Sequence, residues 1–231
     1  MSWSRWLVGL GVAAGTLSLL WWAFSGKTLE SVAYDAHFDR VSQQKVQALV
    51  APFLGQSFWE ADLTRLHAQL QQLEWVKAAQ VTRRWPDQLQ VRLEEQTPVA
   101  RWGEAALLNQ SGAIFYPQSI EGFAHYVRLD GPAVKAKAVL MRYTQLKAQL
   151  QAMPWQLIGL SRLVDGGWRL QLDTGQQILL PSQPWAQRLK RFVRSYPSLK
   201  SPLRKAAKVF DLRYSNGFVV RKITVQSEGV H

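Results

Sequence analysis

The longest apolar segment of the chain lies close to its beginning. Residues 6–24 contain no charged side chain, and as a helix they would span about 28 Å at ~1.5 Å per residue. A bilayer hydrocarbon core is roughly 30 Å thick. A cleaved signal peptide is the alternative, but its apolar region is about 7 to 15 residues long, and the run ends in aromatic residues typical of a membrane interface. The pattern therefore predicts a retained transmembrane helix over residues 6–25.

Charge on the two sides of this helix predicts its orientation. Arg5 and the terminal amine precede the helix and Lys27 follows it, a small excess of positive charge that slightly favours a cytoplasmic N-terminus by the positive-inside rule. Residues 1–5 would then be a cytoplasmic stub, and everything after the helix would lie beyond the membrane. Gly11 and Gly15 have the spacing that lets a second transmembrane helix approach closely, so they are candidate helix-packing residues.

Residues 26–97 show short amphipathic patterns. A strand is expected at residues 29–34, and Ser42 begins an amphipathic helix that Gly55 ends. Ser57 and Glu60 have capping-box spacing and predict the start of a second helix, whose leucines repeat at three and four. A hairpin with arms at 76–85 and 89–93 follows. We expect the order strand, helix, helix, strand, strand.

A domain boundary is predicted at Thr97-Pro98, because a proline ends a strand ladder and restricts the residue before it. Residues 98–231 are then expected to form a second, strand-rich domain. We expect strands at 106–108, 113–115, 157–163, 168–172 and 177–180, and helices at 134–153 and about 185–196. The last hairpin has arms at 209–214 and 218–225 with Asn216-Gly217 as its turn. The predicted class is α+β: a transmembrane helix, a β-α-α-β-β domain, and an antiparallel β-rich domain with flanking helices.

The net charge of +12 is unevenly distributed. Residues 27–97 carry 8 basic and 9 acidic side chains, whereas residues 98–231 carry 19 and 7. A basic domain can bind nucleic acid, but the predicted position beyond the membrane argues against it. Anionic lipid headgroups and an acidic protein partner remain. We favour the protein partner, because the last strand is an expected sheet edge that can accept an added strand. Alternatively, Arg221 and Lys222 protect this edge from aggregation.

The sequence offers little for catalysis. The chain has no cysteine, and its four histidines have no metal-binding spacing. Nucleophile-elbow and phosphate-loop motifs are also missing. We therefore expect no enzyme activity, no metal, no cofactor and no small-molecule substrate.

Three segments carry a family resemblance. Residues 73–77 read LEWVK, residues 81–89 read VTRRWPDQL, and residues 94–102 read EEQTPVARW. They resemble the FtsQ/DivIB family of bacterial cell-division proteins, whose members have one transmembrane helix, a POTRA domain and a C-terminal β-rich domain. The stub before the helix is shorter than in many members. The resemblance implies a non-catalytic, single-pass inner-membrane scaffold with periplasmic domains, which links early and late division proteins at the septum.

The family also implies a binding site. Residues 211–217, DLRYSNG, resemble its C-terminal signature, where the last strands and the preceding helix receive FtsB in complex with FtsL. Arg213 could pair with a partner carboxylate and Tyr214 could be an aromatic contact. The implied contacts are Arg213, Tyr214, Asn216, Gly217, Phe218, Val219, Val220 and Arg221. FtsK, FtsW and FtsI are further candidate partners.

Two other functions stay open at this point. POTRA domains also occur in outer-membrane protein assembly and secretion components, although no series of amphipathic strands sufficient for a barrel follows here. An envelope enzyme such as a peptidoglycan hydrolase would need a cleft with paired carboxylates or a metal triad.

Overall fold

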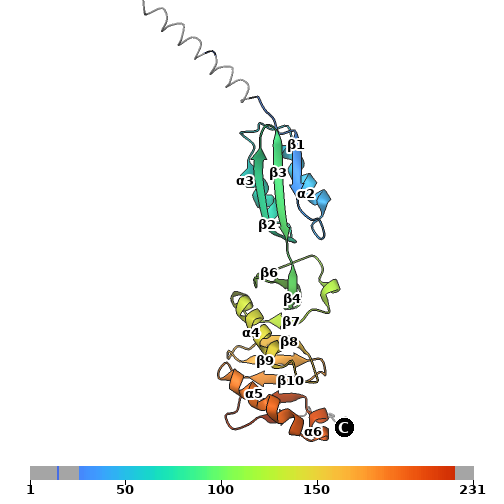
Figure 1. The fold of residues 1–231 in the computed structure, drawn as a ribbon, viewed down its shortest axis with the longest axis vertical. Helices are drawn as coiled ribbons and strands as arrows, with labels where there is room; N and C mark the ends of the chain where they lie inside the picture. Colours follow the sequence, from blue (N-terminus) through green and yellow to red (C-terminus); the bar gives the residue numbers. More distant parts are fainter. Residues whose placement is uncertain (1–14, 16–25, 222–231) are drawn as a thin grey trace, which may run out of the picture. The chain divides into compact units, whose positions relative to one another are not determined.

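The computed structural model describes residue 15 and residues 26–221 of the 231-residue chain. The chain divides into two compact units, residues 1–96 and residues 97–231, each of which has its own sheet and hydrophobic core (Figure 1). Both units combine helices with strands, so the predicted α+β class is confirmed.

The predicted membrane span lies almost entirely outside the described residues. Gly15 is described, and it is helical and exposed, whereas Gly11 is not described. Within the part of the chain that the structure describes, no helix has both the length and the apolar character needed to cross a membrane.

The N-terminal unit has the predicted order of elements. A three-stranded sheet, ordered β1-β3-β2, pairs β3 in parallel with β1 and antiparallel with β2. Helices α2 and α3 pack on this sheet, where Val46, Leu66 and Leu70 are fully buried with Leu89 of β3. The elements are β1 (Ser31–Asp35), α2 (Gln43–Val50), α3 (Leu63–Gln71), β2 (Val76–Arg84) and β3 (Gln88–Glu95).

The predicted start of the second helix is wrong. The helix begins at Leu63, and Asp62 caps it by accepting a hydrogen bond from the Arg65 N–H at 3.0 Å. Ser57 instead pairs with Thr28 in a short bridge, and the next residue, Phe58, is buried. The capping-box spacing therefore belongs to a loop that packs into the core.

The first helix also ends earlier than predicted. Helix α2 stops at Val50, and a 3-10 turn over Ala51–Phe53 follows it. Gly55 lies beyond that turn with a φ of +81°, where glycine is favoured because it has no Cβ. This residue reverses the chain in the loop after the helix.

A nine-stranded sheet forms the C-terminal unit, in the order β12-β11-β10-β9-β8-β7-β4-β5-β6. In β9 the side chains of Trp168, Leu170 and Leu172 are buried, whereas Arg169 and Gln171 between them are exposed. One face of the sheet therefore packs on helices α4 and α5, and at β9 the other face is open to solvent. The strands are β4 (Pro98–Trp102), β5 (Ala106–Asn109), β6 (Ile114–Phe115), β7 (Arg128–Asp130), β8 (Leu157–Arg162), β9 (Trp168–Leu172), β10 (Gln177–Leu180), β11 (Val209–Asp211) and β12 (Val219–Arg221).

The prediction of an antiparallel sheet is wrong for three pairs of strands. Strands β4 and β7, β7 and β8, and β10 and β11 pair in parallel. Parallel neighbours need a crossover connection. Helix α4 (Ala136–Gln149) connects β7 to β8, and α5 (Trp185–Ser195) with α6 (Ser201–Ala206) connects β10 to β11.

The last hairpin differs from the predicted tight turn. Strands β11 and β12 pair antiparallel, but seven residues separate them, from Leu212 to Phe218. Neither Asn216 nor Gly217 has the positive φ that a tight Asn-Gly turn requires. Residues 222–225 of the predicted second arm lie outside the described residues.

Candidate partner-binding edge of the C-terminal domain

Strand β12 forms one edge of the nine-stranded sheet. It pairs with β11 on one side, and on the other side it has no strand neighbour among the described residues. Such an edge presents backbone N–H and C=O groups that can pair with a strand from another chain. We define the C-terminal edge as residues 211–221, which are β12, the end of β11 and the connection between them.

The structure brings the predicted contact residues together at this edge and sorts them by exposure. Tyr214 is 49% exposed and Val219 is 41% exposed. Three members of the set, in contrast, are half-buried. The exposed members are Arg213, Tyr214, Asn216, Val219 and Arg221, and the half-buried members are Gly217, Phe218 and Val220.

Phe218 attaches the edge to the core. Its ring meets that of Phe192 in α5 nearly at right angles, with the centroids 5.2 Å apart, and it lies 6.5 Å from Phe210 of β11. Val220 also packs against this core. These two predicted contact residues therefore hold β12 in place, and they leave the alternate side chains of the strand facing outward.

Asp211 is the electrostatic centre of the edge, and its side chain is fully buried. Its carboxylate accepts two hydrogen bonds from the Arg213 guanidinium group, each 2.9 Å long, one from the Arg213 backbone N–H at 3.2 Å, and one from Nη2 of Arg221 at 2.8 Å. The hydrogen bonds from Arg213 hold the pKa of Asp211 below its usual range, against the opposing effect of burial, and the charge of Arg221 adds to the lowering.

Two arginines of α5 fix the connection before β12. Arg188 donates hydrogen bonds to the backbone carbonyls of Leu212 and Arg213. One turn further along the helix, Nη1 of Arg191 donates to the carbonyl of Ser215 at 2.8 Å. Two of the 19 basic residues of the C-terminal domain thus have a structural role, because they satisfy carbonyl groups in a segment without regular secondary structure.

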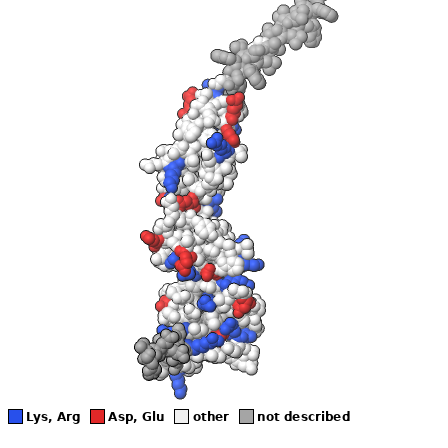
Figure 2. Space-filling view, turned by 180° about the vertical axis from the view of Figure 1, so that it is seen from behind, with Lys and Arg blue, Asp and Glu red and all other residues white. Residues whose placement is uncertain are grey.

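The edge carries more positive than negative charge. Arg213 also approaches Asp165 of the β8–β9 turn, at 3.7 Å between Nη1 and Oδ2. Arg213 and Arg221 nevertheless keep part of their side chains in solvent. Figure 2 shows a band of Lys and Arg across the end of the domain that contains β10 to β12. A surface of this charge is suited to an acidic partner.

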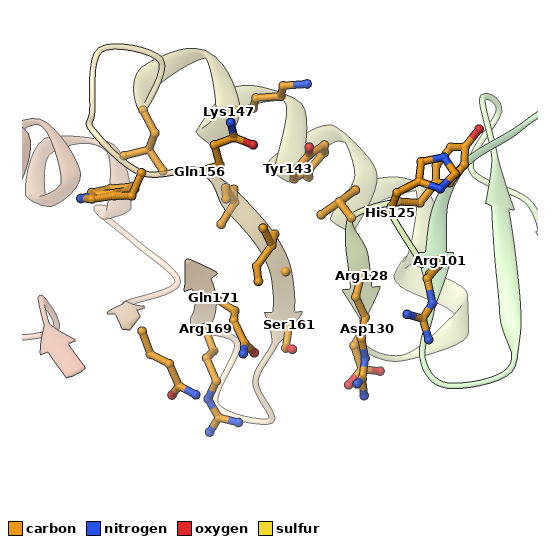
Figure 3. Close-up of a pocket in the computed structure, with 18 of the residues that line it drawn as sticks. Arg101, His125, Arg128, Asp130, Tyr143, Lys147, Gln156, Ser161, Arg169 and Gln171 are labelled. Carbon is orange, nitrogen blue, oxygen red and sulfur yellow. The ribbon is translucent and has the colours of Figure 1, made fainter. Parts of the chain in front are cut away.

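A second candidate surface is a broad hollow of about 1120 Å³ in the C-terminal unit. Figure 3 shows polar side chains that reach toward it from four strands of the sheet. Three of them are guanidinium groups, and Arg128 forms an ion pair with Glu104. The labelled strand residues are Arg101 of β4, Arg128 and Asp130 of β7, Ser161 of β8, and Arg169 and Gln171 of β9. Guanidinium groups in such a hollow are suited to hydrogen bonding with carboxylates.

Asp211, Arg188 and Arg191 were not among the site residues predicted from the sequence. Asp211 stands within the segment that carries the family resemblance, but nothing local indicates its burial. The sequence does contain a signal for the polar lining of the hollow. Arg169 alternates with the buried residues Trp168 and Leu170 in one strand, which places its side chain on the opposite face of the sheet. Among the described residues, no group of three His, Cys, Asp or Glu side chains is arranged to hold a metal ion.

Comparisons with known proteins match both units. The family described as "Cell division protein FtsQ/DivIB, C-terminal" matches residues 100–213, and "POTRA domain, FtsQ-type" matches residues 36–96. The first match ends at Arg213, so most of the C-terminal edge lies beyond it.

Curated relatives extend the similarity over most of the chain. "Cell division protein FtsQ" of Xanthomonas campestris pv. campestris is 31% identical over 220 residues, which cover 94% of this chain and 79% of the relative. The protein of the same description from Shewanella oneidensis is 32% identical over 83% of this chain and 73% of its own. That from Coxiella burnetii is 32% identical over 79% and 75%, respectively. The chain therefore belongs to the FtsQ family of bacterial cell division proteins.

Proposed function

We propose that this protein is a non-catalytic scaffold of the bacterial division complex, and that its C-terminal edge binds the periplasmic part of FtsB in complex with FtsL. The main support for the proposal is that the outer side of β12 has no strand neighbour among the described residues. The strand itself is held in place by the contacts of Phe218 with the core and of Arg221 with Asp211. A partner strand added there would gain backbone hydrogen bonds without first having to order the edge.

The side chains at the edge define the chemistry of the partner. Exposed Val219 would contact an apolar side chain of the added strand, because directly opposite residues of neighbouring strands lie about 5 Å apart. Tyr214 offers a large ring and a hydroxyl group, the combination common in interface hot spots. Arg213 and Arg221 favour a partner segment that carries carboxylates.

The rest of the chain would place this binding site at the division septum. In the proposal, residues 6–25 cross the inner membrane once with the N-terminus in the cytoplasm, so that both units are periplasmic. The POTRA unit would contact earlier members of the complex such as FtsK. FtsW and FtsI are further partners in the proposal, and Gly11 and Gly15 would pack against another transmembrane helix.

The test is capture of the purified FtsB–FtsL periplasmic complex by the full chain in detergent. Tyr214→Ala removes the exposed ring, and a hot-spot residue contributes about 2 kcal/mol, or ~30-fold in affinity. Tyr116→Ala is the matched control, because Tyr116 is also exposed and belongs to the same unit, after β6 at the opposite end of the sheet.

Reversal of Arg213 to Glu is a less direct test, because it would put a second carboxylate beside buried Asp211 and disturb the edge itself. Equal capture by the Tyr214→Ala and Tyr116→Ala variants, with unchanged circular dichroism, would exclude Tyr214 from the interface. Failure of the wild-type chain to capture the complex would exclude the proposed partner.

A further inference from the structure

Three segments of the N-terminal unit meet at the end where residue 27 enters it. The Leu29 N–H donates to the Gln56 carbonyl at 3.0 Å, and the Gly55 N–H donates back to Leu29 at 2.8 Å. The β2–β3 turn joins them through a 2.8 Å hydrogen bond from Glu30 to Asp87. Figure 1 shows that β1 begins and β2 ends at this side of the unit. We call it the entry end.

The entry end carries the exposed large apolar side chains of this unit. Trp85 is 62% exposed, Trp59 is 56% exposed and Leu54 is 41% exposed. Among the described residues of the N-terminal unit, no other large apolar side chain is exposed to this degree. All three belong to the loops and the turn at this end, so the exposed apolar surface of the unit is concentrated there, as at an interaction site.

The loop that presents Trp59 is held in a fixed conformation. The guanidinium group of Arg83, two residues before Trp85, donates to the carbonyl groups of Phe58, Trp59 and Ala61. The buried Phe58 ring also meets the Trp59 ring edge to face, at 5.0 Å between centroids. A rigid display of aromatic rings loses little conformational entropy on binding.

The position of the entry end along the chain identifies what it would contact. The apolar run ends at residue 24, only three residues before Lys27, and three residues span at most about 11 Å. If the run crosses the membrane, the entry end must lie at the bilayer surface. Tryptophan is enriched at this depth because its ring is apolar and its N–H is polar.

The charges around the entry end decide which lipids are needed. Lys27, Arg83 and Arg84 are basic, and Glu30, Glu60 and Asp87 are acidic. This mixture gives no strong attraction to anionic headgroups, so the contact depends on burial of apolar and aromatic surface.

We propose that Trp59, Trp85 and Leu54 insert into the headgroup layer of the membrane and thereby hold the POTRA unit against it. This inference rests on the proposed membrane span. It adds a second membrane contact, which would restrict the orientation of the unit.

The experiment uses the full chain in phosphatidylcholine nanodiscs and a single nitroxide label. The chain has no cysteine, so Glu60→Cys gives one labelling site beside Trp59 with every tryptophan retained. Gln44→Cys is the matched control, because Gln44 is exposed in the first turn of α2, near the opposite end of the unit. Collision rates with oxygen, which enters the bilayer, and with a water-soluble nickel complex report the depth of each label.

We expect the oxygen-to-nickel ratio to be several-fold higher at residue 60 than at residue 44. Combined substitution of Trp59→Ser and Trp85→Ser should lower the ratio at residue 60 to that at residue 44. Equal ratios at the two sites in the otherwise wild-type chain, or a ratio at residue 60 that the double substitution does not change, would overturn the inference.

An alkaline carbonate wash of cell membranes separates this failure from failure of the membrane span. If the chain stays in the membrane but the oxygen-to-nickel ratio at residue 60 equals that at residue 44, the membrane span is present and the second contact is not. Release of the wild-type chain by the wash would contradict both.

Discussion

Asp211 of β11 and Arg221 of β12 form an ion pair, with 2.8 Å between Oδ2 and Nη2, that joins the last two strands of the sheet. The Asp211 side chain is fully buried, and the Arg213 guanidinium group also donates hydrogen bonds to both of its carboxylate oxygens. The edge strand is therefore fixed to its neighbour by a charged side-chain contact in addition to the backbone ladder.

This arrangement makes the C-terminal unit sensitive to acid. The folded-state pKa of Asp211 is lowered, whereas an unfolded chain has an ordinary value of about 3.9. The stabilisation from the carboxylate is fully present above this value and is lost as the pH falls through the lower folded-state pKa. We expect Asp211→Asn to lower the unfolding free energy at neutral pH by about 2 kcal/mol and to flatten its dependence on pH below about 4.

Urea unfolding at a series of pH values, followed by tryptophan fluorescence, measures both effects. Glu121→Gln changes an exposed acid of the same unit and serves as control. If the Asp211→Asn and wild-type curves stayed parallel through the acid range, Asp211 would not be responsible for the acid sensitivity.

The α5 arginines should control the order of the C-terminal edge more than the stability of the domain. Arg191→Ala removes the hydrogen bond to the Ser215 carbonyl, at a global cost of about 1 kcal/mol. We expect faster amide exchange in residues 212–217 and weaker partner binding, because the partner must then order this segment.

Lys190→Ala is the control for this prediction, since Lys190 is an exposed neighbour on the same helix. Hydrogen exchange followed by mass spectrometry resolves the segment. Identical exchange in the two variants would mean that Arg191 does not fix the connection.

In the N-terminal unit, Glu95 should contribute more to the free energy of unfolding than its neighbour Glu94. The Glu95 carboxylate accepts hydrogen bonds from the backbone N–H groups of Asp39, Arg40 and Val41, at 2.9 to 3.2 Å. We expect Glu95→Ala to destabilise this unit by about 2 to 3 kcal/mol, because hydrogen bonds to a charged group are strong.

Glu94→Ala should cost about 0 to 1 kcal/mol, since Glu94 forms an exposed ion pair with Lys77. Thermal unfolding of the two variants gives the comparison directly. A Glu95→Ala variant as stable as Glu94→Ala would show that the backbone contacts of Glu95 contribute little.

Local patterns predicted the elements that have a clear period. Leu66 and Leu70 are fully buried as their spacing indicates, and strands β8, β9 and β10 lie within one residue of the predicted bounds. Strand β7 was not predicted, because only Leu129 of its three residues is buried and one buried position shows no alternation.

Contacts between distant segments explain the remaining differences. The parallel pairing of β10 with β11 depends on where α5 and α6 pack, and no short stretch of sequence contains that information. At the C-terminal edge, the sequence indicated the segment through its family resemblance. The burial of Asp211 between Arg213 and Arg221 required the strands to be in register, which a one-residue shift would change.

Partner binding at β12 is tested most directly by measuring amide hydrogen exchange in this strand when the FtsB–FtsL periplasmic complex binds to the full chain. The proposal that the outer side of β12 accepts a partner strand predicts that amide exchange in residues 218–221 slows when the complex is added, with no change at β6, the opposite edge of the sheet. Bound complex with unchanged exchange in β12 would contradict it.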